Sequence, residues 1–130
     1  MKNKRLVISI LLFTGLVLVA SCVDDDEPQI IAQYRKINAE EALRMMHDSK
    51  DYILLDVRTI EEFTEKHIEG AILIPDYELA ERAAIELPDK AMLILVYCRS
   101  GRRSESAAHE LVEMGYINVY DIGGIVDWPF

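Results

Sequence analysis

Hydrophobic residues occur in short clusters along this chain, and the two strongest clusters are typical of buried strands. Residues 92–97 are six consecutive apolar residues with no alternation, the pattern of a central parallel strand covered on both faces. Residues 53–57 form a second compact apolar segment. Weaker patterns of the same kind predict three short strands, over residues 34–37, 71–74 and 119–121.

The segments between these strands carry helix signals. Asn38 with Glu41, and Thr59 with Glu62, have the spacing of capping boxes, in which each side chain satisfies a free amide of the first turn. Asp76 can cap a third helix. The expected helices cover residues 38–47, 59–66, 76–85 and 105–114, with Gly115 as a C-terminal cap and a short helical segment after Gly123-Gly124.

Strands that alternate with helices predict an α/β fold with a mostly parallel sheet. Ligands of such sheets bind beyond the carboxyl ends of the strands. Cys98 directly follows the strongest predicted strand. The chemistry of this chain is therefore expected at that end of residues 92–97.

The first 21 residues have a different character and are predicted to be a lipoprotein signal peptide. Lys2, Lys4 and Arg5 precede an apolar run of 15 residues, which is short for a membrane span and typical of a signal-peptide core. The run ends in Val19-Ala20-Ser21-Cys22, which resembles a bacterial lipobox with Cys22 as the lipidated first residue of the mature chain. The alternatives are an uncleaved N-terminal anchor and a soluble exported protein.

Residues 22–33 are expected to form an acidic tether, and residues 34–130 one domain. The sequence Asp24-Asp25-Asp26-Glu27-Pro28 is a charge run followed by a helix breaker, so it favours an extended, solvated chain. It resembles a surface-export signal of some lipoproteins, and a plain spacer fits equally. The expected location is the bacterial cell envelope, lipid-anchored and extracytoplasmic, in the periplasm or on the cell surface.

The charge balance argues against nucleic acid as a partner. The net charge is −9, and it becomes −12 once the three cations of the signal peptide are removed. Binding to phosphate backbones requires a basic surface. Against this acidic background, Arg99, Arg102 and Arg103 stand out as a local positive cluster beside Cys98.

The setting of Cys98 predicts a reactive thiol. A buried strand leads into the loop Cys98-Arg99-Ser100-Gly101-Arg102-Arg103-Ser104, and a helix follows. A helix N-terminus and nearby guanidinium groups both favour the thiolate over the thiol, so we expect a lowered pKa. The loop amides can form a nest for an anion. A nucleophilic sulfur that faces an anionic substrate is the resulting prediction.

Other uses of the two cysteines are less compatible with the sequence. If Cys22 is acylated, Cys98 has no partner, which excludes a disulfide and dithiol redox chemistry. His47, His67 and His109 show no metal-ligand spacing with one another or with Cys98. We therefore expect neither a metal nor a cofactor.

Four motifs occur in one order and together resemble a single-domain rhodanese, a thiosulfate sulfurtransferase. They are Asp56-Val57-Arg58 followed by Glu61-Glu62-Phe63; His67-Ile68-Glu69-Gly70-Ala71 followed by Ile74-Pro75; the loop from Cys98 to Ser104; and Gly123-Gly124-Ile125 with Trp128. This resemblance implies an open, mostly parallel five-stranded sheet flanked by helices on both faces. It also implies transfer of sulfane sulfur through a persulfide on Cys98, from thiosulfate or a persulfide donor to a thiol, or to cyanide.

The resemblance also assigns roles around the loop. The amides from Arg99 to Ser104 would hold the charged persulfide, with Gly101 allowing the backbone to curl. Arg99 and Arg102 are expected to bind the anionic donor, while Arg103 is partly structural. The predicted substrate-binding set is Arg99, Ser100, Gly101, Arg102, Arg103 and Ser104.

Asp56 and Arg58 are expected to be structural residues near the site, with Arg58 paired to Glu62 one turn later. Tyr97 and Trp128 are expected in the core, where either could form a wall of the pocket.

The length of the Cys98 loop distinguishes a sulfurtransferase from a phosphatase. Related phosphatases of the cell-division-cycle type hold an arginine six positions after the cysteine, in a wider cradle that fits phosphate. Arg103 lies five positions after Cys98, and residue 104 is a serine. A phosphatase or arsenate reductase, a persulfide carrier or sulfur-sensing module with little thiosulfate turnover, and an envelope interaction domain stay as alternatives.

Overall fold

The computed structural model describes residues 32–130. The predicted signal peptide, Cys22 and most of the predicted tether lie outside the described residues. Within residues 32–130, a five-stranded sheet has the order β1-β5-β4-β2-β3, and every neighbouring pair is parallel. The strands are β1 (Arg35–Lys36), β2 (Ile53–Asp56), β3 (Ile72–Leu73), β4 (Ile94–Cys98) and β5 (Val119–Gly124). The predicted α/β class and five-stranded parallel sheet are confirmed.

Strand β4 is the central strand of the sheet. It pairs with β2 on one side and β5 on the other, and all five of its residues are buried. Alternate side chains enter the two halves of the core. Ile94, Val96 and Cys98 pack into one hydrophobic cluster, and Leu95 and Tyr97 pack into the other. The unbroken apolar sequence of this strand follows from its burial on both faces.

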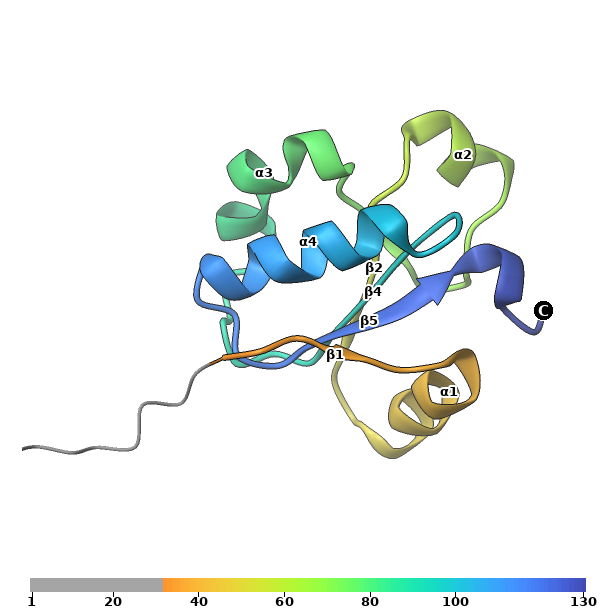
Figure 1. Cartoon of the computed structure of the whole chain (residues 1–130), viewed down its shortest axis with the longest axis horizontal. Coiled ribbons are helices and arrows are strands. Elements are labelled where there is room, and N and C mark those ends of the chain that lie inside the picture. Colours follow the sequence, from red (N-terminus) through yellow and green to blue (C-terminus); the bar gives the residue numbers. More distant parts are fainter. Residues whose placement is uncertain (1–31) are drawn as a thin grey trace, which may run out of the picture.

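Helices cover both faces of the sheet (Figure 1). The helices α3 (Leu79–Glu86) and α4 (Arg102–Glu113) supply Leu79, Ala83, Ala107 and Leu111 to the cluster that contains Cys98. Helix α1 (Ala39–Asp48) supplies Ala42 to the opposite cluster. None of the helices in residues 32–130 combines the length and the apolar character that a bilayer-spanning segment needs.

The remaining elements lie where strands end. Helix α2 (Ile60–Glu65) follows β2, the single turn η1 (Asp76–Glu78) follows β3, and the turn η2 (Ile125–Asp127) follows β5. Thr59 and Glu62 form the complete predicted capping box of α2. Consecutive strands therefore deliver α2, η1, the Cys98 loop and η2 to the same edge of the sheet, where parallel α/β folds bind ligands.

Two sequence-based helix boundaries were wrong. Helix α4 begins at Arg102 and not at Glu105, because Gly101 adopts a positive φ of 99° that turns the chain directly from the loop into the helix. Asp76 begins a 3₁₀ turn rather than capping α3, and its carboxylate accepts a bond from the neighbouring amide of Tyr77.

Candidate active site

The Cys98 loop is a tight turn between a buried strand and a helix. Cys98 is the last residue of β4 and is 1% exposed, and α4 begins four residues later at Arg102. The backbone amide of Gly101 donates a hydrogen bond to Cys98 Sγ over 3.1 Å. The loop thus curls around the sulfur, with backbone N–H groups directed inward, as a nest for an anion requires.

The surroundings of the sulfur favour its ionised form. Burial alone would raise the pKa of the Cys98 thiol. Hydrogen bonds from the amides of Ser104, Gly101 and Ser100 outweigh burial, so the pKa lies below its ordinary value. The sequence-based prediction invoked the loop amides, the helix terminus and the arginines; the amides of the loop and of the first turn of α4 lower the pKa, and no arginine is among the main causes.

Ser104 connects the loop to a buried carboxylate that sequence reasoning missed. Its Oγ donates to Asp121 Oδ1 over 2.6 Å, and the amide of Gly123 donates to the same oxygen over 3.0 Å. Asp121 is fully buried, and its other oxygen has no hydrogen-bond partner among the described residues. Lys36 lies 3.9 Å from that oxygen. One feature of the sequence could have indicated this role, namely a charged residue inside an apolar strand, two positions before Gly123.

Ser104 itself is buried beneath the loop. Its hydroxyl bonds to Asp121, so its amide is the group that faces the sulfur. Ser100 and Gly101 likewise contribute amides that face the sulfur. The structure therefore brings the amides of three predicted loop residues together around one atom, and the roles of the predicted set toward substrate stay a prediction.

The three loop arginines divide into two groups. Arg103 donates two hydrogen bonds to the Glu62 carboxylate, over 2.8 and 2.9 Å, and so ties the start of α4 to α2. These bonds lower the pKa of Glu62 to about 2. Arg99 and Arg102 are exposed and have no ion-pair partner within residues 32–130. Two cations at the mouth of the loop are thus available to an anion.

The expected pairing of Arg58 with Glu62 was wrong. Arg58 turns back to Asp56, with 2.7 Å between Nη2 and Oδ2, and the same nitrogen donates to the carbonyl of Lys66 over 2.7 Å. Asp56 is fully buried, and a buried carboxylate requires a close cation. Asp56 is the last residue of β2, and the structural role predicted for this pair stays a prediction.

The aromatic residues differ in burial. Tyr97 is fully buried in β4, as expected, and its hydroxyl accepts a hydrogen bond from the amide of Ile68. Trp128 packs against the α1-side cluster but is partly exposed. In residues 32–130, no group of three His, Cys, Asp or Glu side chains is placed to hold a metal ion.

Strand β5 supports the loop through direct backbone contact. A Cβ atom on Gly124 would lie 2.4 Å from the carbonyl oxygen of Arg99 and 2.7 Å from Ser100 Cα. The amide of Val126 donates to that same Arg99 carbonyl over 3.3 Å. The loop backbone therefore lies directly against the backbone of Gly124, where no side chain would fit.

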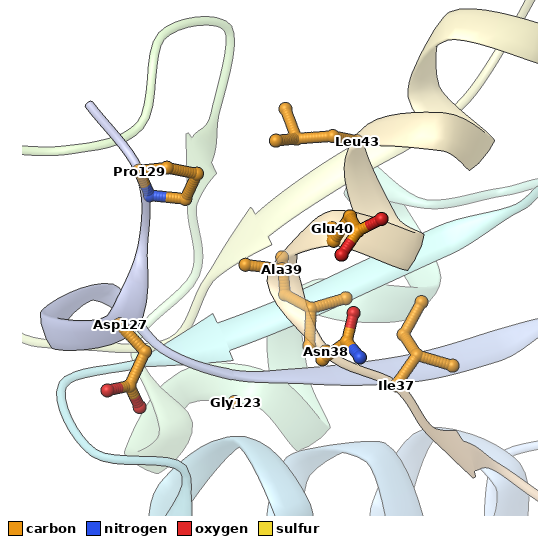
Figure 2. A pocket seen from close by; sticks show the side chains of 9 residues that line it. Ile37, Asn38, Ala39, Glu40, Leu43, Gly123, Asp127 and Pro129 are labelled. Atoms are coloured by element: carbon orange, nitrogen blue, oxygen red, sulfur yellow. The ribbon is translucent and has the colours of Figure 1, made fainter.

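Two hollows open near this edge of the sheet. The larger, about 650 Å³, lies between the start of α1 and the C-terminal segment, with Asn38, Leu43, Asp127 and Pro129 around it (Figure 2). Its lining includes no residue of the Cys98 loop. The smaller, about 360 Å³, is lined by Arg99, by residues of α2 and by the segment after β5. Only the smaller one shares a residue with the loop.

Comparison with known proteins identifies the relatives of this chain. Residues 38–129 match the Rhodanese-like domain family. The thiosulfate sulfurtransferase PspE of Escherichia coli is 45% identical over 73 residues, 56% of this chain and 70% of that protein. The thiosulfate sulfurtransferase GlpE of Coxiella burnetii is 36% identical over 96 residues, 73% of this chain and 87% of that protein.

Solved structures of rhodanese domains also resemble this chain. An E. coli rhodanese with anions has a TM-score of 0.57 at 42% identity, covering 60% of this chain and 94% of that chain. A rhodanese-related protein from Thermoplasma volcanium has a TM-score of 0.63 at 35% identity, covering 73% and 90%. A tRNA uridine(34) hydroxylase of Yersinia pestis is 31% identical over 118 residues, but the match spans 32% of that protein.

The backbone contact at Gly124 leads to a first prediction. In Gly124→Ala the new Cβ would collide with loop backbone, so the loop must shift away from β5 and its amides away from the sulfur. We expect the pKa of Cys98 to rise, its alkylation by iodoacetamide near neutral pH to slow, and the unfolding free energy to fall by about 1–3 kcal/mol. Peptide mass spectrometry of the Cys98 peptide measures the rate, and urea titration measures the stability.

Gly115→Ala is the matched control. Gly115 also has a positive φ, of 93°, but a Cβ there meets nothing within 4 Å. This variant should lose about 1–2 kcal/mol of stability through backbone strain and keep the alkylation rate of the unsubstituted protein. Equal alkylation rates in the two variants would show that the contact at Gly124 does not shape the loop.

Proposed function

This chain belongs to the rhodanese family, and from that membership we propose that it is a sulfurtransferase that carries sulfane sulfur on Cys98. The observation that supports this proposal most directly is a buried thiol whose pKa is lowered by inward-facing amides. A thiolate is the nucleophile that the reaction needs. The same amides could also hold a persulfide anion, whose negative charge lies on the outer sulfur, one bond beyond Cys98 Sγ.

The first half of the proposed reaction loads the sulfur. The Cys98 thiolate attacks the outer sulfur of thiosulfate, the bond between the two thiosulfate sulfurs breaks, and sulfite leaves with the electron pair. Arg99 and Arg102, both exposed at the mouth of the loop, would attract and orient the dianionic donor. The product is a Cys98 persulfide held by the loop amides, in the manner of an oxyanion hole.

The second half unloads the sulfur. An acceptor thiolate attacks the outer persulfide sulfur, the bond to Cys98 Sγ breaks, and Cys98 regains its thiolate. The lowered pKa of Cys98 reduces the need for a general base beside it. Cyanide can replace the thiol in an assay.

The pairing of Arg103 argues against the phosphatase alternative. Phosphatases of this type hold an arginine six positions after the cysteine, where this chain has Ser104, and Arg103, five positions after Cys98, is engaged by two hydrogen bonds to Glu62. The alternative of a persulfide carrier or sulfur-sensing module keeps the same Cys98 chemistry. It differs in accepting sulfur from a persulfide and hardly from thiosulfate.

The decisive experiment is intact-mass spectrometry of the purified chain after incubation with thiosulfate, before and after treatment with a reductant. We expect a gain of one sulfur atom that the reductant removes. Cys22→Ser should keep this gain, and Cys98→Ser should lose it completely. A folded, alkylatable protein that gains sulfur from a persulfide donor but none from thiosulfate would favour the carrier; no gain from either donor would refute the proposal.

We further propose that the protein acts in the cell envelope, held to a membrane by lipid on Cys22. The support is the order of basic segment, apolar core and lipobox-like sequence before Cys22. We expect detergent-dependent extraction of the protein from bacterial membranes, and a mass increase on the N-terminal cysteine. If Cys22→Ser fractionates and migrates like the unsubstituted chain, the anchor is refuted.

A further inference from the structure

The smaller hollow beside the Cys98 loop, which we term the side pocket, is bordered by two walls that both connect to the loop. One wall is α2 with Lys66 after it, and Glu62 of this wall is held by Arg103. The other wall is the segment after β5, where the amide of Val126 donates to the carbonyl of Arg99. Arg99 directly follows Cys98 and is the one loop residue in the lining of the side pocket.

Two cations of the side pocket are free to bind an anion. Arg58 and Glu62 are neutralised from outside the pocket by Asp56 and Arg103. Lys66 and Arg99 also lie in the lining and have no carboxylate partner within residues 32–130. An unpaired ammonium or guanidinium group favours an anionic ligand.

The other lining groups are apolar and aromatic. Trp128 and Ile125 are partly buried, while Val126 and Phe130 are exposed by 65% and 66%. The Lys66 ammonium lies 3.3 Å from the centre of the Phe130 ring, a cation–π contact that holds the charge at the apolar wall. A ligand that fits this surface has an apolar body and an anionic end.

We propose that the side pocket is the acceptor site, and that it selects thiols carried on an apolar stem that ends in a carboxylate. The carboxylate pairs with Lys66, the stem lies against Trp128, and the thiol reaches the sulfur on Cys98 past Arg99. This inference rests on the proposed sulfurtransferase function and names the class of its second substrate. Arg99 and Arg102 remain the contacts of the donor.

The chemistry of the step needs no further reactant. The acceptor thiolate forms a bond to the outer sulfur of the Cys98 persulfide, and the bond between that sulfur and Cys98 Sγ breaks. The electron pair of the broken bond returns to Cys98 as thiolate. The products are the acceptor persulfide and the free enzyme.

A matched pair of probes tests the proposal. Mercaptohexanoate and mercaptohexanol share the thiol and the stem and differ in the charged end. We load Cys98 with thiosulfate, remove the excess, and follow sulfur loss in a single turnover at low acceptor concentration. The acid should react roughly fivefold faster than the alcohol, the size expected of one partly exposed ion pair.

Two variants locate the source of this preference. Lys66→Gln should abolish it while persulfide formation from thiosulfate, in which Lys66 has no part, keeps its rate. Lys50→Gln removes the same charge from an exposed position outside the pocket lining and should keep the preference. Equal rates for the two probes in the unsubstituted protein, or an unchanged preference in Lys66→Gln, would overturn the proposal.

Binding can be read separately from reaction. Trp128 is the one tryptophan of the chain, so its fluorescence reports directly on the side pocket. Hexanoate should change this fluorescence saturably, more weakly in Lys66→Gln, while hexanol should bind less tightly than hexanoate. Absence of a persulfide with intact hexanoate binding would refute the proposed function alone. A persulfide without any fluorescence response would refute the acceptor site alone.

Discussion

The backbone amides around Cys98 favour a negative charge on a sulfur at the end of a buried strand, and the proposed chemistry depends on them. Cys98 is 1% exposed, and burial of an ionised group without hydrogen bonds is costly. The amides of Ser100, Gly101 and Ser104 provide donors that are fixed before any substrate arrives. The fold, the glycine positions and the ion pairs around the loop all serve to keep those amides directed at one atom.

Three contacts hold the loop in that shape, two of them from β5 and one from α2. Gly124 of β5 allows backbone to rest on backbone, Asp121 of β5 fixes Ser104, and Glu62 of α2 fixes Arg103. These contacts act on the start, the end and the outer side of the loop. The functional geometry thus depends on residues that never touch the sulfur.

Local sequence was sufficient for most of the architecture and for the position of Cys98 at the end of the central strand. The apolar segment 92–97 and the Thr59–Glu62 capping box are short-range signals that tertiary packing did not override. The loop also had a recognisable composition. Its chemistry followed from a thiol between a buried strand and a helix N-terminus.

Long-range contacts are where sequence reasoning was insufficient. Arg103 and Glu62 are 41 positions apart, and nothing in their neighbourhoods distinguished this pairing from that of Arg58 with Glu62. Because Asp56 is buried, its carboxylate needs a close cation, and Arg58 pairs with it. Glu62 therefore pairs with Arg103. Asp121 was overlooked for a related reason, since its role depends on β5 lying under the loop. Such partners become visible only once the strand order is known.

The most direct test of the amide cradle is the pKa of Cys98 in the folded and the unfolded chain. Thiolate ultraviolet absorbance can be followed through a pH titration in Cys22→Ser, with and without urea, and the same titration of Cys22→Ser/Cys98→Ser subtracted. We predict a midpoint below the unfolded value of about 8.5 in the folded chain. The thiolate then stabilises the fold above the unfolded pKa, and this contribution is lost as pH falls through the folded pKa. A folded midpoint at or above the unfolded one would contradict the account.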